Sequence, residues 1–113
     1  MTPGKLNLTC PQGSTFSKTL TYKIDSSPVN LTGYSSNLQV REYHYSNNYI
    51  ASLNQTSGIT LGGSAGTIDV LISASDTESF VPGSYVYDLE IAVGGTVTRL
   101  IEGKFYVTPE VTR

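Results

Sequence analysis

The sequence predicts an all-β protein, folded as one antiparallel β-sandwich domain of about seven to eight strands over residues 1–113. The first observation is composition. Charged residues make up only 14% of the chain, and polarity comes from Ser and Thr, with 14 of each, beside 11 Gly. Thr and Tyr favour the pleated surface of strands, whereas Gly favours turns. The second observation is a recurring alternation of apolar and polar residues, separated by turn residues. At 113 residues, the chain can bury one hydrophobic core.

Four alternating runs predict strands in the first half of the chain. These runs are residues 5–10, 15–25, 37–45 and 49–54, with residues 26–34 as a crossover that Val29 and Leu31 anchor in the core. The predicted inward-facing residues are Leu6, Leu8, Cys10, Phe16, Leu20, Tyr22, Ile24, Leu38 and Val40.

Four further runs predict strands in the second half. They are residues 58–61, 67–73, 84–93 and 96–109, joined as hairpins by "GGSAG" at 62–66 and by "GG" at 94–95. Gly103 indicates a bulge or a close approach of another backbone segment. The predicted inward-facing residues are Ile68, Val70, Ile72, Tyr85, Tyr87, Leu89, Ile91, Val93, Val97, Ile101, Phe105 and Val107.

A single short helical turn is expected near residues 75–80. Ser75 and Glu78 have the Ser-x-x-Glu spacing of a helix N-terminal capping box. Phe80 would close the end of the core, and Pro82 would end the turn. A short link of this kind lets a chain cross between the two sheets of a sandwich, which we therefore favour over a barrel.

The residues that carry chemistry are sparse. With one histidine, His44, and one cysteine, Cys10, the chain cannot form a His/Cys metal cluster. The carboxylate pairs Asp76/Glu78 and Asp88/Glu90 fall on a turn and on the outer face of a strand, where solvent reaches them. We therefore expect no catalytic residue, no cofactor and no metal ion, and a protein that is not an enzyme.

Partners of some classes are disfavoured by charge and hydropathy. The net charge is −2 and the basic residues are scattered, which disfavours nucleic acid as a partner. No apolar run is long enough to cross a bilayer. The start of the chain lacks the basic and apolar regions of a signal peptide, so we expect folding and assembly in the cytoplasm.

Tyrosines and outward-facing apolar residues are the best candidates for an interface with other proteins. Tyrosine provides a large amphipathic contact area, and apolar residues on an outer face favour a subunit contact. Two alternatives for the tyrosines are capping of the sandwich edge and stacking on carbohydrate. The candidate interface residues are Tyr43, His44, Tyr45, Tyr49, Leu71, Val86, Leu100 and Tyr106.

Three segments together resemble small structural proteins of tailed bacteriophages. They are "GSTFSKTLTYKIDSSPVNLTGYSSNLQVRE", "ITLGGSAGTIDVLISASDTESFVPGSYVYDLEI" and "VTRLIEGKFYVTPEVTR". This family comprises immunoglobulin-like (Ig-like) β-sandwich virion proteins, similar to the N-terminal domain of upper baseplate proteins. The positions that match its crossover and its last two strands are Leu31, Tyr34, Tyr85, Tyr87, Leu89, Gly103 and Phe105.

The resemblance implies a virion structural protein without a catalytic residue. Its implied role is that of an adaptor in the tail, baseplate or neck, which binds neighbouring virion proteins through sheet faces and strand edges. A capsid decoration (cement) protein bound to the major capsid protein is the first alternative, and a carbohydrate-binding module for the host surface is the second. We also expect a homo-oligomer, as a trimer or a ring, located in the virion.

Overall fold

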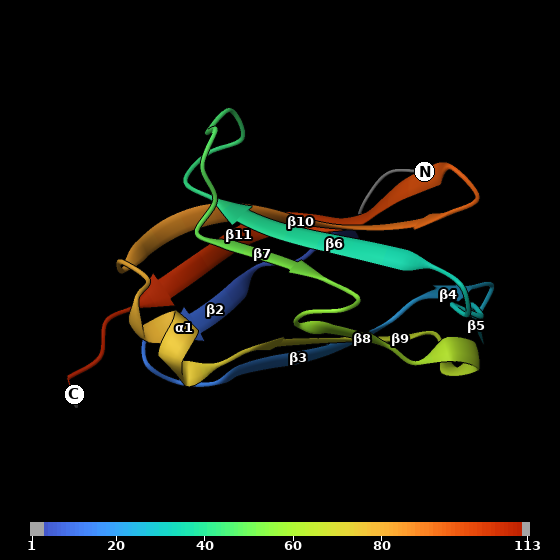
Figure 1. Ribbon diagram of the computed structural model, residues 1–113, viewed down its shortest axis with the longest axis horizontal. Coiled ribbons are helices and arrows are strands. Elements are labelled where there is room, and N and C mark those ends of the chain that lie inside the picture. The colour runs from blue at the N-terminus through green and yellow to red at the C-terminus, as the bar shows by residue number, and fades with distance from the viewer. Residues whose placement is uncertain (1–3, 112–113) are drawn as a thin grey trace.

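The computed structural model describes residues 4–111, which form a β-sandwich of two main layers (Figure 1). The first layer is a six-stranded sheet in the order β1-β11-β10-β6-β7, in which β2 also pairs with β11. Its strands are β1 (Gly4–Lys5), β2 (Leu8–Pro11), β6 (Ser35–Arg41), β7 (Ala51–Asn54), β10 (Gly83–Val93) and β11 (Thr96–Thr108). The β-sandwich class is therefore confirmed at this level.

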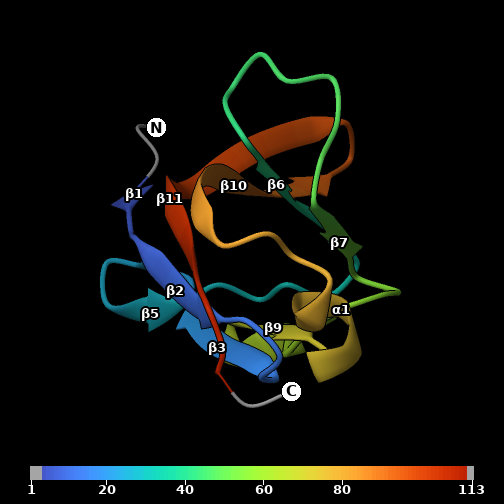
Figure 2. The same cartoon turned by 90° about the vertical axis from the view of Figure 1, so that its left-hand side faces the viewer.

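The second layer is a three-stranded antiparallel sheet in the order β3-β9-β8, which covers one face of the first (Figures 1 and 2). Its strands are β3 (Phe16–Thr21), β8 (Ile59–Leu61) and β9 (Thr67–Ile72). A separate hairpin and two helical turns complete the fold: β4 (Lys23–Ile24) with β5 (Ser27–Pro28), the 3-10 turn η1 (Gly63–Ala65) and the helix α1 (Ala74–Glu78).

Residues 4–111 contain eleven strands, more than the predicted seven to eight. The predicted run 5–10 is divided into β1 and β2, because Leu6 and Asn7 leave the regular ladder between them. The run 15–25 ends as β3, and its last residues turn away as β4 to pair with β5. Ile24 is consequently 54% exposed, so the prediction that it faces the core is wrong.

The six-stranded sheet is mixed, so the prediction of a wholly antiparallel sandwich is wrong. Both β1 and β2 pair with β11 in parallel. A tight hairpin can join only antiparallel strands. Here β2 leads instead across to β3 in the other sheet, which leaves it free to lie parallel to the last strand of the chain.

The core lies between the two sheets, and three aromatic rings join the sheets within it. Phe16 of β3 and Phe105 of β11 have ring centroids 5.5 Å apart, and Tyr87 of β10 meets Phe105 edge-on at 6.5 Å. Cys10 is fully buried beside them in the same cluster. The other buried apolar residues are Leu8, Leu31, Leu38, Val40, Ala51, Ile59, Ile68, Val70, Ile72, Phe80, Tyr85, Leu89, Ile91, Leu100 and Val107.

A β-bulge in β11 reverses which residues face the core near its start. Leu89 pairs with Ile101 and Glu90 pairs with Arg99, so Leu100 is an extra residue without a partner on β10. Leu100 is therefore buried, with 7% of its surface exposed, and Val97 is 61% exposed. Both predictions, Leu100 outward and Val97 inward, are wrong for this one reason.

Close to the bulge, the segment between β1 and β2 lies directly against β11. The Tyr87 hydroxyl donates a hydrogen bond to the Leu6 carbonyl oxygen at 2.7 Å. A Cβ on Gly103 would collide with that same carbonyl group. Of the two predictions for Gly103, the close backbone approach is confirmed, whereas the bulge lies at Leu100.

The predicted helical turn exists but begins earlier than expected. Its N-cap is Ser73, whose hydroxyl accepts a hydrogen bond from the Asp76 amide at 3.3 Å, so the predicted capping role of Ser75 is wrong. The reason is that β9 ends at Ile72, which makes Ser73 the first residue free to cap. Phe80 is buried after the turn, as predicted.

Replacing Gly103 with alanine should destabilise the protein. The new methyl group meets the Leu6 carbonyl, and overpacking of this kind costs about 1–3 kcal/mol in the free energy of unfolding. Urea denaturation measures the loss. Gly83→Ala is the matched control, since its Cβ would meet only the Tyr85 ring at 3.9 Å. Equal stability of the two variants would contradict the close approach.

Alkaline pH should destabilise the fold in two steps. Burial raises the pKa of Cys10 from 9.0 to about 11 and that of Tyr87 from 10.0 to about 12. Because the unfolded chain loses these protons first, the free energy of unfolding falls as the pH rises above 9 and continues to fall until both groups ionise in the folded state. In Cys10→Ala, urea denaturation across this range should show the decline starting near pH 10 instead. An unchanged onset in that variant would contradict the assignment to Cys10.

Candidate interaction surface

The eight predicted interface residues do not form one surface. Four lie in the loop between β6 and β7, Leu71 lies on the outer face of the three-stranded sheet, and Leu100 is buried. Val86 is partly buried and Tyr106 is 38% exposed, both on the outer face of the six-stranded sheet. The loop, residues 42–50, is the most concentrated group, and it projects beyond the sandwich in Figures 1 and 2.

Loop 42–50 exposes three large aromatic side chains. Tyr45 is 91% exposed, Tyr43 is 56% exposed and Tyr49 is 54% exposed. His44 is also exposed. Aromatic residues are enriched at the centres of protein interfaces, because one side chain buries a large apolar area there.

Arg41, the last residue of β6, holds this loop in place. Its guanidinium group donates one hydrogen bond to the Ser46 carbonyl oxygen at 2.9 Å and another to the Gln39 side-chain oxygen at 2.7 Å. The same group lies 5.6 Å from the centroid of the Tyr49 ring. The Ser46 hydroxyl adds a hydrogen bond to the Asn48 carbonyl at 3.0 Å. The tyrosines are thus presented on a loop with its own hydrogen-bond network.

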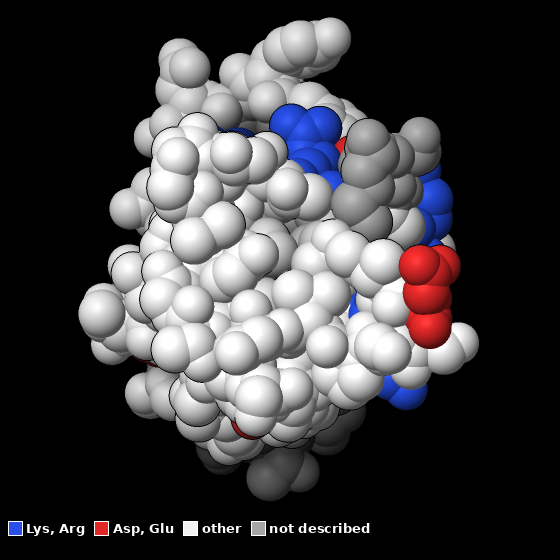
Figure 3. Space-filling model, turned by 90° about the vertical axis from the view of Figure 1, so that its right-hand side faces the viewer, with Lys and Arg blue, Asp and Glu red and all other residues white. Residues whose placement is uncertain are grey.

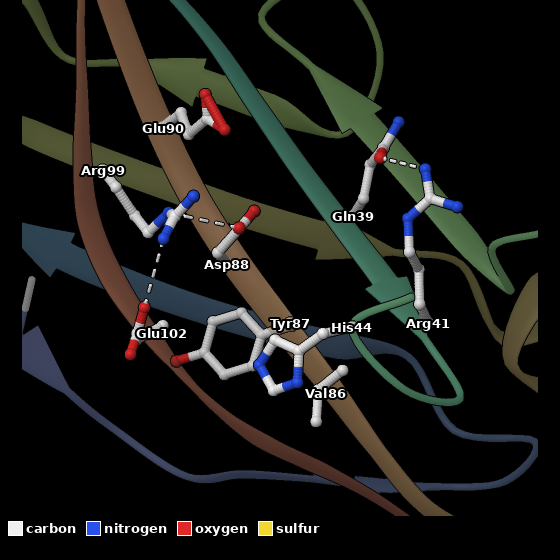
Figure 4. A pocket seen from close by; sticks show the side chains of 9 residues that line it. All are labelled: Gln39, Arg41, His44, Val86, Tyr87, Asp88, Glu90, Arg99 and Glu102. Atoms are coloured by element: carbon white, nitrogen blue, oxygen red, sulfur yellow. Dashed lines mark hydrogen bonds and ion pairs between the residues drawn. The ribbon is translucent and has the colours of Figure 1, made fainter. Parts of the chain in front are cut away.

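A shallow hollow of about 290 Å³ lies on the outer face of the six-stranded sheet (Figure 4). Arg99 crosses it to Asp88 at 3.4 Å and to Glu102 at 3.6 Å, and Lys5 also pairs with Glu102. The hydrogen bond from Lys5 is the main reason that the pKa of Glu102 lies below its ordinary value. The hollow is lined by Gln39, Arg41, His44, Val86, Tyr87, Asp88, Glu90, Arg99 and Glu102.

These carboxylates lie in an ion-pair network rather than in an acid–base arrangement. Asp88 and Glu102 both pair with Arg99. Across residues 4–111, no three His, Cys, Asp or Glu side chains lie close enough together to hold a metal ion. In the same range, no helix is long and apolar enough to span a membrane. That the protein is not an enzyme stays a prediction.

A second hollow, of about 390 Å³, lies at the base of loop 42–50. One wall is formed by Tyr49 and Ile50 of the loop, and the other by Phe80, Val81 and Tyr85 at the start of β10. The remaining lining residues are Glu42, Ser46, Asn48 and Ser79. No sequence pattern indicates this hollow, because its walls lie about 30 residues apart in the chain.

Val81 is the residue of this hollow that the sequence could have indicated. It is apolar, it lies outside every predicted strand between Phe80 and Pro82, and it is 70% exposed. Its position is held because the Tyr85 hydroxyl donates to the Val81 carbonyl oxygen, and the Gln12 side chain donates to the Phe80 carbonyl at 2.9 Å.

No protein-family model matches this chain, and no curated protein matches it at a significant level. The resemblance to phage structural proteins therefore stays a prediction from the sequence motifs.

Replacing Arg41 with alanine should loosen loop 42–50 while leaving the sandwich folded. Two hydrogen bonds to charged guanidinium are lost, so backbone amides of residues 43–50 should exchange with deuterium about tenfold faster. Hydrogen–deuterium exchange measures this. Arg99→Ala is the control, because its guanidinium pairs with Asp88 of β10 and with Glu102 of its own strand, β11. Unchanged exchange in the loop of Arg41→Ala would contradict the role of Arg41.

Proposed function

We propose that this protein is a non-catalytic structural component of a bacteriophage virion that binds neighbouring virion proteins through loop 42–50. The observation that carries the proposal is the set of three exposed tyrosines on a loop that Arg41 holds in place. On association, their apolar surface would be buried, which contributes roughly 25 cal/mol per Å². Less conformational entropy is lost when the loop is already ordered.

We also propose that the sandwich is Ig-like, as the sequence resemblance implies. One sheet contains β11, β10, β6 and β7 in order, and the other contains β3, β9 and β8. This matches the G-F-C-C′ and B-E-D orders of variable-type Ig domains. The hydrogen bond from Tyr85, near the start of β10, to the carbonyl of Val81 has the form of a tyrosine corner. Strand order and corner together support this assignment.

The number of copies of the protein in each particle would distinguish its possible positions in the virion. A tail, baseplate or neck adaptor would be present in a few to dozens of copies per particle, whereas a capsid decoration protein would follow the capsid lattice in hundreds. Cryo-electron microscopy of the intact particle separates these two roles. A protein found in neither place would contradict the proposal, and glycan binding that depends on Tyr43, Tyr45 and Tyr49 would favour a carbohydrate-binding module instead.

Replacing Tyr43, Tyr45 and Tyr49 together with serine should abolish incorporation into particles without unfolding the protein. All three side chains are at least half exposed, so the core keeps its packing. Incorporation is measured by mass spectrometry of purified particles, and folding by thermal denaturation. Leu71→Ser is the matched control, since it removes a side chain of similar exposure, 53%, from the opposite sheet. Normal incorporation of the triple variant would exclude the loop as the docking site.

A further inference from the structure

The hollow at the base of loop 42–50 is preformed and partly apolar. Tyr49 and Ile50 face Phe80, Val81 and Tyr85 across a space of about 390 Å³, which lies at the lower end of the volumes of ligand pockets. Figure 2 views this end of the sandwich, with loop 42–50 at the top and α1 below.

Both walls of the hollow are held by hydrogen bonds. Arg41 ties the loop wall through the Ser46 carbonyl, and Tyr85 and Gln12 tie the opposite wall through the carbonyls of Val81 and Phe80. A partner side chain would therefore enter a site that needs little ordering, which favours binding.

Acidic side chains around the hollow favour a positively charged group of a partner. The segments that meet at this end, residues 42–50, 73–82 and 109–111, contain Glu42, Asp76, Glu78 and Glu110 and no Lys or Arg. The C-terminal segment belongs to this end because the Glu110 amide donates to Gln12, which in turn donates to Phe80. The opposite end, shown in Figure 3, is mostly uncharged, with both basic and acidic side chains visible.

Glu42 lies in the hollow itself, next to two tyrosines. It lines the space together with Tyr49 and Tyr85. Burial, and after it the negative charge of Glu42, raises the pKa of Tyr85. Arg41, the residue before the loop, already contacts Gln39, Ser46 and Tyr49. A carboxylate beside aromatic rings suits an incoming guanidinium, which pairs with the former and stacks on the latter.

We propose that this hollow is a socket for an arginine of the partner protein, flanked by an apolar residue that contacts Tyr49 and Val81. The partner's surface should therefore carry an arginine next to an apolar residue. This inference rests on the proposed function, because it assumes that this end of the molecule faces another protein.

The test is an NMR titration of the ¹⁵N-labelled protein with two capped peptides. One is acetyl-Gly-Arg-Leu-Gly-amide, and the other carries citrulline, which has the shape of arginine without its charge. We expect the arginine peptide to shift the amides of residues 42–50 and 79–85 saturably, and the citrulline peptide to bind about tenfold more weakly. In Glu42→Gln, the arginine peptide should bind as weakly as the citrulline peptide, and the affinity of the citrulline peptide should not change.

Glu102→Gln is the matched control, because Glu102 lies in the other hollow on the outer face of the six-stranded sheet. It should leave both peptides unaffected. Equal binding of the two peptides, shifts that map elsewhere, or no saturable shift would each overturn the socket. These outcomes leave the proposed function standing if the protein is found in particles, whereas its absence from particles overturns that function whatever the peptides do.

Discussion

The contact between Phe16 and Phe105 is the interaction on which the sandwich depends, since it joins one sheet to the other. The rings lie 5.5 Å apart, and Tyr87 meets Phe105 from the side. With Cys10 as its single cysteine, the chain has no internal disulfide to do the same work. Aromatic rings bury about 150–250 Å² each, so this cluster replaces a covalent link with packing. In the six-stranded sheet, β1, β2 and β6 pair directly with β10 or β11, and β7 pairs with β6.

Two edge strands, β3 and β2, are poorly suited to pairing with another chain. On β3, Lys18 lies between Phe16 and Leu20 in the alternation, so a charged side chain occupies a position of the inward-facing series at the edge. On the other sheet, β2 is four residues long and ends at Pro11, which has no amide hydrogen to donate. Charges at inward positions, short strands and proline are common protections of sheet edges. These two edges therefore offer little to a strand of another chain.

Loop 42–50 is held in position by its attachment to the six-stranded sheet. Its anchor, Arg41, is the last residue of β6, and its neighbour across the hollow, Val81, is held by Tyr85 of the adjacent strand β10. Two neighbouring strands thus position both walls of one hollow. Because these strands also carry the core residues Val40 and Tyr87, the rigidity of the core extends to the surface that we propose as the docking site.

The sequence by itself determined the class of the fold and the inward face of its most regular strands. Ile68, Val70 and Ile72 are buried as their alternation predicts, because that alternation is a local property of the chain. Only the tertiary structure decided the parallel pairing of β2 with β11, the bulge that buries Leu100, and the hollow between Tyr49 and Val81. Each of these depends on contacts between distant segments, and the spacing of neighbouring residues carries no information about which segments will meet.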